Sequence, residues 1–317
     1  MSTPTRIAVV GATGAFGTKH LDGLMVIADA EVTVVSGTRL EPTQAVADRY
    51  GVRNTAVGLD AVLERDDVDA VILATPTGLH ATQTRAVLAA GKHVQVEIPL
   101  ADSLADAEAT LAVAEASDRV AMVGHTRRFN PSHQLVHERI ASGDFAVQQL
   151  DVQTYFFRRT NTNAQGEARL WTDHLLWHHA AHTVDLFSYQ AGRIVQANAI
   201  QGPVHPELGI AMDMSIQLKS ETGAICTLSL SFNNEGPFGT FFRYIGDTAT
   251  YLARYDDLFT GDDEQIDVSH VAVSRNGIEL QDREFIAAIR EGREPNSSLR
   301  QVIDSYRVLG QLEEQLA

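Results

Sequence analysis

Four histidines lie within nine residues near the middle of the chain: His174, His178, His179 and His182. If this segment is helical, His174, His178 and His182 are four residues apart and share one face. The unperturbed pKa of histidine lies nearer neutral pH than that of any other side chain. A row of such side chains therefore predicts a site at which protons are transferred. Asp185, three residues beyond His182, could orient an imidazole as a triad carboxylate does.

Two other interpretations of the histidines stay open. Histidines at this spacing on a helix can bind zinc. We expect no metal here, because the segment has no glutamate in a His-Glu-x-x-His arrangement and His179 points away from the shared face. The cluster could also be a structural helix or a subunit contact.

A glycine-rich turn near the N-terminus indicates what would receive the electrons. It follows the apolar run Ile7–Val10 and opens a helix, so its glycines permit a tight turn and close approach of a pyrophosphate to a helix N-terminus. The spacing Gly-x-x-Gly-x-x-Gly is one residue longer than the commonest form, and an unliganded turn is the alternative. The predicted cofactor contacts are Gly11, Ala12, Thr13, Gly14, Ala15, Phe16 and Gly17.

The end of the second predicted strand favours NADP over NAD. An NAD enzyme normally has Asp or Glu here for the ribose 2′-hydroxyl, and this chain has neither. Ser36, Thr38 and Arg39 could instead hold a 2′-phosphate, although Arg39 could equally be a surface residue. NAD stays possible as a weaker cofactor.

Two further turns follow predicted strands and are candidates for the same cofactor. Ligands of open parallel sheets bind at the carboxyl ends of the strands. Helix capping and helix breaking would explain the same residue types without a ligand. The residues are Thr75, Pro76, Thr77, His80, Glu97 and Pro99.

The elements that must position these residues fall into two domains. Over residues 1–124, strands and helices alternate, which predicts a doubly wound parallel sheet of the Rossmann type. Gly91 is a typical helix C-cap and Ser103 a typical N-cap. The strand candidates are Ile7–Val10, Glu31–Ser36, Ala70–Ala74, His93–Val96 and Ala121–Val123. The helix candidates are Phe16–Ile27, Pro42–Tyr50, Gly78–Ala90 and Leu104–Ala116.

Residues 125–317 predict an α+β domain with an open-faced, mostly antiparallel sheet, because its strands follow one another without long crossovers. The acidic composition of Asp256–Asp267 predicts a solvated loop. The strand candidates are Val147–Phe157, Ile194–Ile200, Met212–Lys219, Ala224–Asn233 and Phe241–Asp247. The helix candidates are Ser132–Ala141, Asp282–Arg290 and Ser298–Gln315.

Composition narrows the class of protein. The 317 residues carry a formal net charge of −16, so we expect no nucleic-acid partner, and any anion site must be a local pocket of Arg or His. No apolar run approaches the ~20 residues of a membrane span. With one cysteine, Cys226, no intramolecular disulfide is possible. We expect a cytoplasmic protein without a membrane partner.

Several motifs resemble the Gfo/Idh/MocA oxidoreductase family over essentially the whole chain. They are the glycine turn and the segments Ala74–His80, Gly91–Val94, Glu97–Pro99 and Gly124–Pro131. The resemblance implies hydride transfer between NAD(P) and a carbinol carbon, and a second domain whose open sheet often forms oligomer contacts. A homodimer or homotetramer is therefore expected.

The resemblance also assigns roles and shows two departures. It implies that His182 is the catalytic base, with His178 relaying the proton or binding a ring oxygen. Most members have lysine where this chain has Ile98, and aspartate tends to stand at the position of His178. Both changes leave the proton chemistry to the histidines.

A narrower resemblance concerns the segments Val94–Asp102, Gly124–His133, Asp151–Arg159 and Trp171–Asp185. They look like family members that oxidise the cyclic hemiacetal of a protocatechuate ring-cleavage product to the lactone 2-pyrone-4,6-dicarboxylate. This implies a small dicarboxylate hemiacetal as substrate and NADP as acceptor.

Arginine is the natural partner of such a substrate, because its planar fork matches a carboxylate. Adjacent residues on a strand face opposite ways, so one of each arginine pair is expected at the site. Surface or interdomain ion pairs are the alternative role. The substrate candidates are Arg127, Arg128, Arg158 or its neighbour Arg159, Asn130, Trp171, His179 and His133.

Two other functions stay open. One is a sugar or inositol dehydrogenase of the same fold, against which the paired arginines argue, since a neutral polyol needs no cations. The other is a non-catalytic NADP-binding sensor, because a fold alone does not establish activity.

Overall fold

The computed structural model describes residues 3–162, 168, 173–271 and 277–316. It divides the chain into two compact units. Unit 1 contains residues 1–125 and 278–303, and unit 2 contains residues 126–277 and 304–317. The first division falls one residue from the predicted boundary. The return of residues 278–303 to unit 1 was not predicted, and it corrects the assignment of everything after residue 124 to the second domain.

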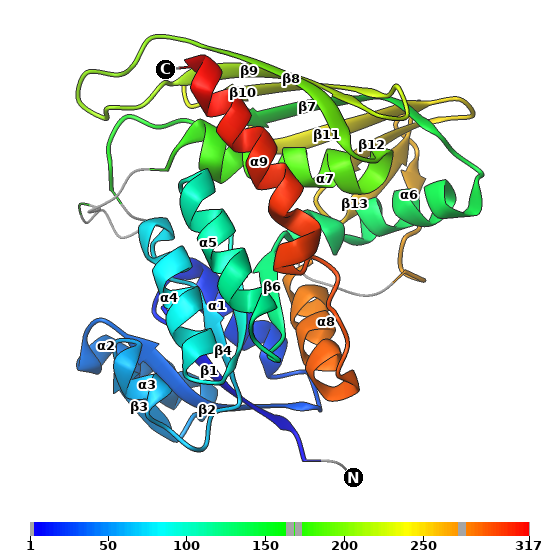
Figure 1. Cartoon of the computed structure of the whole chain (residues 1–317). Helices are drawn as coiled ribbons and strands as arrows, with labels where there is room; N and C mark the ends of the chain where they lie inside the picture. The colour runs from blue at the N-terminus through cyan, green and yellow to red at the C-terminus, as the bar shows by residue number, and fades with distance from the viewer. Residues whose placement is uncertain (1–2, 163–167, 169–172, 272–276, 317) are drawn as a thin grey trace. The chain divides into compact units, whose positions relative to one another are not determined.

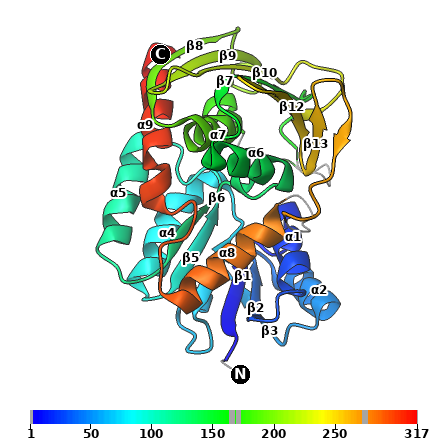
Figure 2. The same ribbon diagram turned by 90° about the vertical axis from the view of Figure 1, so that its right-hand side faces the viewer.

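Unit 1 is a six-stranded parallel sheet with the order β3-β2-β1-β4-β5-β6. Its central strands are continuous apolar runs because helices cover both faces. In Figure 2, α4 and α5 lie on one face, while α1 and α8 lie on the other. The strands are β1 (Thr5–Val10), β2 (Ala30–Gly37), β3 (Asn54–Val57), β4 (Ala70–Leu73), β5 (His93–Glu97) and β6 (Ala121–Gly124).

The helices of unit 1 mostly follow their sequence signals. Ser103 caps α5 by accepting a hydrogen bond from the Asp106 N–H at 3.2 Å, and Gly91 has a left-handed φ of 72°. The short α3 and the edge strand β3 were not predicted, because neither carries an apolar run. The helices are α1 (Ala15–Leu24), α2 (Leu40–Tyr50), α3 (Asp60–Leu63), η1 (Thr77–Leu79), α4 (His80–Ala89), α5 (Leu104–Glu115) and α8 (Ile278–Glu291).

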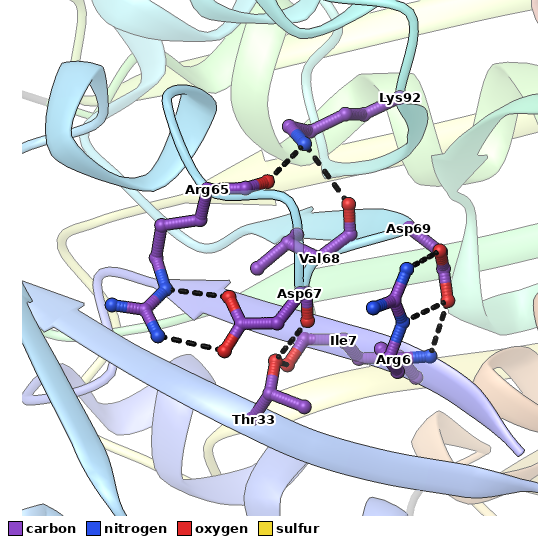
Figure 3. A network of polar contacts seen from close by, with 8 residues as sticks. All are labelled: Arg6, Ile7, Thr33, Arg65, Asp67, Val68, Asp69 and Lys92. Carbon is purple, nitrogen blue, oxygen red and sulfur yellow. Dashed lines mark hydrogen bonds and ion pairs between the residues drawn. The ribbon is translucent and has the colours of Figure 1, made fainter.

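Polar contacts tie together the amino ends of the strands of unit 1 (Figure 3). The Arg6 guanidinium donates to both carboxylate oxygens of Asp69, at 2.9 and 2.6 Å. The buried ammonium of Lys92 donates to the carbonyls of Arg65 and Val68, at 2.8 and 2.9 Å. This network lies at the end of the sheet opposite the carboxyl ends where ligands bind, so its role is structural.

The return of the chain to unit 1 is fixed by packing and by hydrogen bonds. Helix α8 packs beside α1. The Ser297 hydroxyl donates to the carbonyl of Val123 at 2.7 Å, and Ser298 forms a bridge with Met122 in β6. Helix α9 (Leu299–Leu316) then begins in unit 1 and ends in unit 2.

Unit 2 contains an eight-stranded sheet with the order β14-β13-β12-β11-β7-β10-β9-β8. The pair β7–β10 is parallel and the other pairs are antiparallel. Helices α6 and α7 lie along one face (Figure 1), and alternate residues of β9 are exposed on the other. The strands are β7 (Val147–Tyr155), β8 (Ile194–Gln201), β9 (Asp213–Ser220), β10 (Ile225–Ser231), β11 (Gly239–Gly246), β12 (Thr250–Arg254), β13 (Asp257–Thr260) and β14 (Gln265–Ile266).

The predicted loop over Asp256–Asp267 is wrong, because β13 and β14 lie within it. Leu258 is fully buried, and its strand pairs with β12, so tertiary pairing outweighs the acidic composition. The helices of unit 2 are η2 (Thr126–Arg128), α6 (Pro131–Ser142), the π-helical turn η3 (Leu175–Ala180) and α7 (Ala181–Ala191).

Candidate active site

The glycine-rich turn has the geometry of a dinucleotide site. Gly11 has a φ of 84°, and a Cβ there would lie 2.2 Å from the carbonyl oxygen of Ala74. A Cβ on Gly17 would lie 2.3 Å from the Gly11 oxygen, so no side chain fits at either position. Helix α1 begins at Ala15 after Gly14, which has no side chain to cap it. The first N–H groups of the helix therefore receive no side-chain cap from Gly14, and N–H groups in this position suit a pyrophosphate.

The residues predicted to hold a 2′-phosphate divide into two groups. Ser36 is fully buried, and its hydroxyl donates to the Gly58 carbonyl at 2.8 Å. It therefore stabilises the strand ends rather than offering its hydroxyl to a phosphate, and its assignment is corrected. Thr38 and Arg39 are exposed directly before α2. The positive end of this helix adds to the charge of Arg39.

His80 connects two loops at the carboxyl ends of β4 and β5. Its Nδ1 lies 2.7 Å from the Pro99 carbonyl oxygen, and its Nε2 lies 2.8 Å from the Thr75 carbonyl oxygen. Thr77 donates from its hydroxyl to Asp102 at 3.3 Å. Because His80 is 1% exposed, its ring serves to position the two loops. Direct contact with the cofactor, as predicted from sequence, does not fit this burial.

Glu97 belongs to a buried cluster whose central residue was not predicted. His20 of α1 places Nδ1 2.8 Å from an oxygen of Asp282 in α8 and Nε2 3.1 Å from an oxygen of Glu97. Gln95 donates to the same Asp282 oxygen at 2.7 Å, and Gln281 donates to the same Glu97 oxygen at 3.1 Å. The cluster thus joins the helix of the glycine turn to the end of β5.

Opposite charges stabilise this buried cluster. Burial alone would lower the pKa of His20, but the charges and hydrogen bonds of Asp282 and Glu97 raise it to about 10. Burial would raise the pKa of Glu97, yet the hydrogen bond and charge of His20 hold it below its usual value. At Asp282 burial dominates and raises the pKa. His20 is therefore an imidazolium at neutral pH.

The histidine segment of unit 2 is not the regular α-helix that the four-residue spacing predicted. His174 is extended, with φ −106° and ψ 135°, and its Nδ1 accepts a hydrogen bond from the Leu176 N–H at 3.2 Å. A π-helical turn follows, and α7 begins only at Ala181. Because a π-turn bonds residues five apart, His174, His178 and His182 do not share one α-helical face.

Packing against the last helix holds the π-turn in place. Trp177 is 2% exposed and donates from Nε1 to a carboxylate oxygen of Glu313 at 2.7 Å. Its ring stacks on Tyr306, with centroids 6.5 Å apart. The histidines around it keep partial exposure.

His179 lies between two aromatic rings and stays neutral. Its ring centroid is 5.3 Å from Phe156 and 5.1 Å from Phe232, with His178 also 5.1 Å away. Burial, together with the charges of His178 and Arg158, lowers the pKa of His179 to about 3. A group with so low a pKa is a weak base, which disfavours His179 as the residue that abstracts a proton.

The two adjacent arginines of η2 have different surroundings. Arg128 donates to both oxygens of Asp185, at 2.8 and 2.6 Å, and both residues are buried. Asp185 therefore serves as the counter-charge of Arg128, where the sequence suggested that it orients His182. Arg128 also lies over the ring of Tyr189, at 4.6 Å. These contacts disfavour Arg128 as a substrate ligand.

Arg127 is held by aromatic faces. Its guanidinium lies 5.0 Å from the ring centroid of Tyr255 and 5.8 Å from that of Phe242. Nη1 is 3.4 Å from the amide oxygen of Asn130, whose own amide donates to Asp256 at 2.6 Å. Burial lowers the pKa of Arg127. Within the described residues its buried Nε has no hydrogen-bond partner.

The other substrate candidates are distributed as follows. Arg158 forms an ion pair with Asp173. Arg159 is exposed and donates to the side chain of Asn233 at 3.1 Å. His133 is buried against the Tyr244 hydroxyl. Trp171 lies outside the residues that the structure describes.

Comparisons with known proteins agree with this architecture. Residues 5–125 match the model for the oxidoreductase family with an NAD-binding Rossmann fold, GFO_IDH_MocA, and residues 131–272 match that for bacterial oxidoreductases, C-terminal. The 4-carboxy-2-hydroxymuconate-6-semialdehyde dehydrogenase of Sphingobium sp. strain SYK-6 is 69% identical over 98% of both chains. Inositol 2-dehydrogenase of Rubrobacter xylanophilus is 32% identical over 57% of this chain and 51% of its own.

Solved structures share the same fold. Levoglucosan dehydrogenase in complex with NADH and levoglucosan has a TM-score of 0.85 at 17% identity, covering 99% of this chain and 97% of its own. Among the described residues, no helix combines the length and apolar character needed to cross a membrane. By its sequence matches and its fold, the chain belongs to the Gfo/Idh/MocA family of NAD-binding oxidoreductases.

Proposed function

We propose that this oxidoreductase converts the cyclic hemiacetal of 4-carboxy-2-hydroxymuconate-6-semialdehyde to the lactone 2-pyrone-4,6-dicarboxylate, with NADP as acceptor, in protocatechuate breakdown. The observation that carries the proposal is the 69% identity, over 98% of both chains, to a dehydrogenase named for that semialdehyde. The reaction removes a hydride from carbon and a proton from the hydroxyl oxygen. NADP, when bound, supplies the electron sink.

The remaining tasks fall to this chain's own residues. Unit 1 binds the cofactor through the glycine turn and the N-terminus of α1. In unit 2, His182 is the proposed base, and His178 is the proposed relay in the turn before it. His182 is the second residue of α7, and its side chain is partly exposed, as a base that meets a substrate requires.

Arg127 is the proposed ligand of a substrate carboxylate. The net charge of −16 repels a dianion at long range, so binding depends on a local cation. The guanidinium of Arg127 is desolvated and rests against the rings of Tyr255 and Phe242. A carboxylate that meets such a group gains a charge-assisted hydrogen bond.

The neighbouring arginines provide a matched test of this assignment. Arg127→Gln is expected to lower kcat/KM for the hemiacetal by about ten- to a hundredfold, the value of a hydrogen bond to a charged group. Arg128→Gln is expected to destabilise the fold by about 3–5 kcal/mol, because it removes the bidentate, buried counter-charge of the Asp185 carboxylate. Urea denaturation and steady-state kinetics on both variants separate the two roles. The assignment would be contradicted if the two variants lowered the stability by the same amount and lowered kcat/KM by the same factor.

Thr38 and Arg39 are the proposed ligands of the 2′-phosphate. Arg39→Ala is expected to raise KM for NADP by about ten- to a hundredfold while KM for NAD hardly changes. Arg53→Ala is the control, because Arg53 is an exposed arginine of the same unit outside the cofactor turns. Equal loss with both cofactors would show that Arg39 does not contact the 2′-phosphate.

The function itself is tested by supplying ring-cleaved protocatechuate and following the absorbance of reduced nicotinamide, with NADP and NAD in parallel. Rapid reduction with the hemiacetal, faster with NADP, is the expected result. Myo-inositol is the comparison substrate, because an inositol 2-dehydrogenase is also similar to part of this chain. Reduction with myo-inositol alone would replace the proposed substrate by a polyol.

The exposed face of the sheet in unit 2 is the proposed contact between copies of the chain. Residues of β9 that alternate with its buried positions, such as Gln217 and Lys219, lie on this face. Light scattering on the protein as it elutes from gel filtration is expected to give the mass of a dimer or tetramer. A monomer mass of 34.5 kDa at micromolar concentration would contradict it.

A further inference from the structure

Three potential metal ligands come together at the start of the histidine segment. Asp173, His178 and His179 each offer one ligand atom, and these atoms all lie within 4.8 Å of one another. The prediction of no metal assumed an α-helix in which His174, His178 and His182 share one face and His179 points away from it. The π-turn removes that argument, since it brings the rings of the adjacent His178 and His179 to a centroid separation of 5.1 Å.

A second observation indicates that something binds here. Nε2 of His179 is buried and has no hydrogen-bond partner in the parts of the chain that the structure describes. Phe156 and Phe232 pack against the same ring and offer no hydrogen-bonding groups from their side chains. Buried polar atoms in native proteins are nearly always satisfied, so an unsatisfied imidazole nitrogen calls for a ligand.

The donor set selects the kind of ligand. Two imidazoles and one carboxylate suit Zn²⁺ and similar transition-metal ions, whereas Mg²⁺ and Ca²⁺ prefer oxygen. Three protein ligands leave a fourth tetrahedral position for water or another small ligand. We propose that Asp173, His178 and His179 form a binding site for Zn²⁺, and that the bound ion inhibits the enzyme by competing with its substrate.

The inhibitory part rests on the proposed function, because it requires the hemiacetal to bind beside His178 and His179. The binding part does not depend on the substrate.

The neighbouring cation, Arg158, affects how tightly Zn²⁺ binds. Arg158 pairs with the Asp173 carboxylate and therefore competes with the metal for it. Replacing Arg158 should therefore raise the affinity for Zn²⁺, whereas replacing one of the three ligand residues should lower it.

The experiment uses the full, untagged chain after treatment with a chelator and gel filtration. Calorimetry with zinc chloride measures affinity and stoichiometry, and Co²⁺ as a probe reports the ligands through its visible absorption. We expect one ion per chain. His179→Asn should weaken binding at least about tenfold, since even residues that only support metal ligands change affinity that much. Arg158→Gln should tighten it.

His270→Asn is the matched control, because His270 is an exposed histidine outside the cluster. It should bind zinc as the unaltered chain does. Circular dichroism checks that each variant folds, and Asp173→Asn replaces His179→Asn if the latter does not. Absence of stoichiometric binding, or equal binding by the unaltered chain and a folded ligand variant, would overturn the site.

The inhibitory part has its own readout. Zn²⁺ should raise the apparent KM for the hemiacetal without lowering kcat, and the chelator should reverse the effect. Zinc that binds at one equivalent without changing the KM would overturn the inhibition while leaving the binding site in place. Because binding is measured without substrate or cofactor, failure of the proposed reaction cannot be mistaken for failure of the metal site.

Discussion

His182→Gln is expected to lower kcat for hemiacetal oxidation by about 10²- to 10⁴-fold, the usual contribution of a general base. Glutamine preserves much of the size and polarity of the side chain but cannot accept the substrate proton. The glycine turn of unit 1 is unchanged, so the affinity for NADPH, measured by fluorescence titration, should stay within about twofold of the original value.

His178→Gln is the matched comparison for this variant. A relay contributes less than the base itself, so we expect a smaller fall in kcat. His179 provides a further distinction, because its pKa of about 3 keeps it neutral across the working range and it cannot cause a change in rate near neutral pH. The acid limb of the kcat profile should therefore disappear in His182→Gln and persist in His178→Gln.

Two results would contradict the assignment of His182. One is a His182→Gln variant that keeps kcat within a factor of about three. The other is a folded variant whose lost activity is accompanied by an equal loss of NADPH affinity, since a base that acts on the substrate does not hold the cofactor.

The second large effect concerns His20, whose imidazolium lies fully buried between Asp282 and Glu97. Its pKa in the folded state is about 10, above the 6.5 of an unfolded chain. The stabilisation is therefore complete below pH 6.5 and is lost as the pH rises from there through 10. The slope contributed by this one proton is at most about 1.4 kcal/mol per pH unit.

His20→Gln tests this directly. At pH 7 the variant is expected to be about 3–5 kcal/mol less stable, because neutral Gln can donate a hydrogen bond but gives neither Asp282 nor Glu97 a counter-charge. The difference from the original chain should shrink as the pH rises toward 10. Hydrogen exchange on peptides of α1 and β5 is the appropriate measurement, since it reports directly on the two elements of unit 1 that the cluster joins.

His270→Gln serves as the control, because an exposed histidine contributes no buried charge. A constant difference in stability between pH 6.5 and 10 would show that His20 is neutral in the folded protein, and would remove the ion-pair interpretation of the cluster.

Local sequence patterns were enough to predict most strands and helices of unit 1 and the family to which the chain belongs. Strands buried on both faces must be apolar runs, and glycine turns and caps such as Ser103 mark where helices begin. The structure confirms the Rossmann-type sheet and the Ser103 cap. These features could be predicted because the sequence signal of each strand, turn and cap lies within a few neighbouring residues, although the strands themselves pair over longer distances.

Tertiary structure alone decided the features that depend on distant partners. His20 and Asp282 are 262 positions apart, and only the return of α8 to unit 1 brings them together. Asp185 distinguishes Arg128 from Arg127, which are adjacent in sequence and indistinguishable by type. The anchoring of Trp177 to α9 accompanies a π-turn where the histidine spacing predicted an α-helix. Periodicity encodes the geometry of a segment, whereas charge pairing and packing are set by whatever the fold places against it.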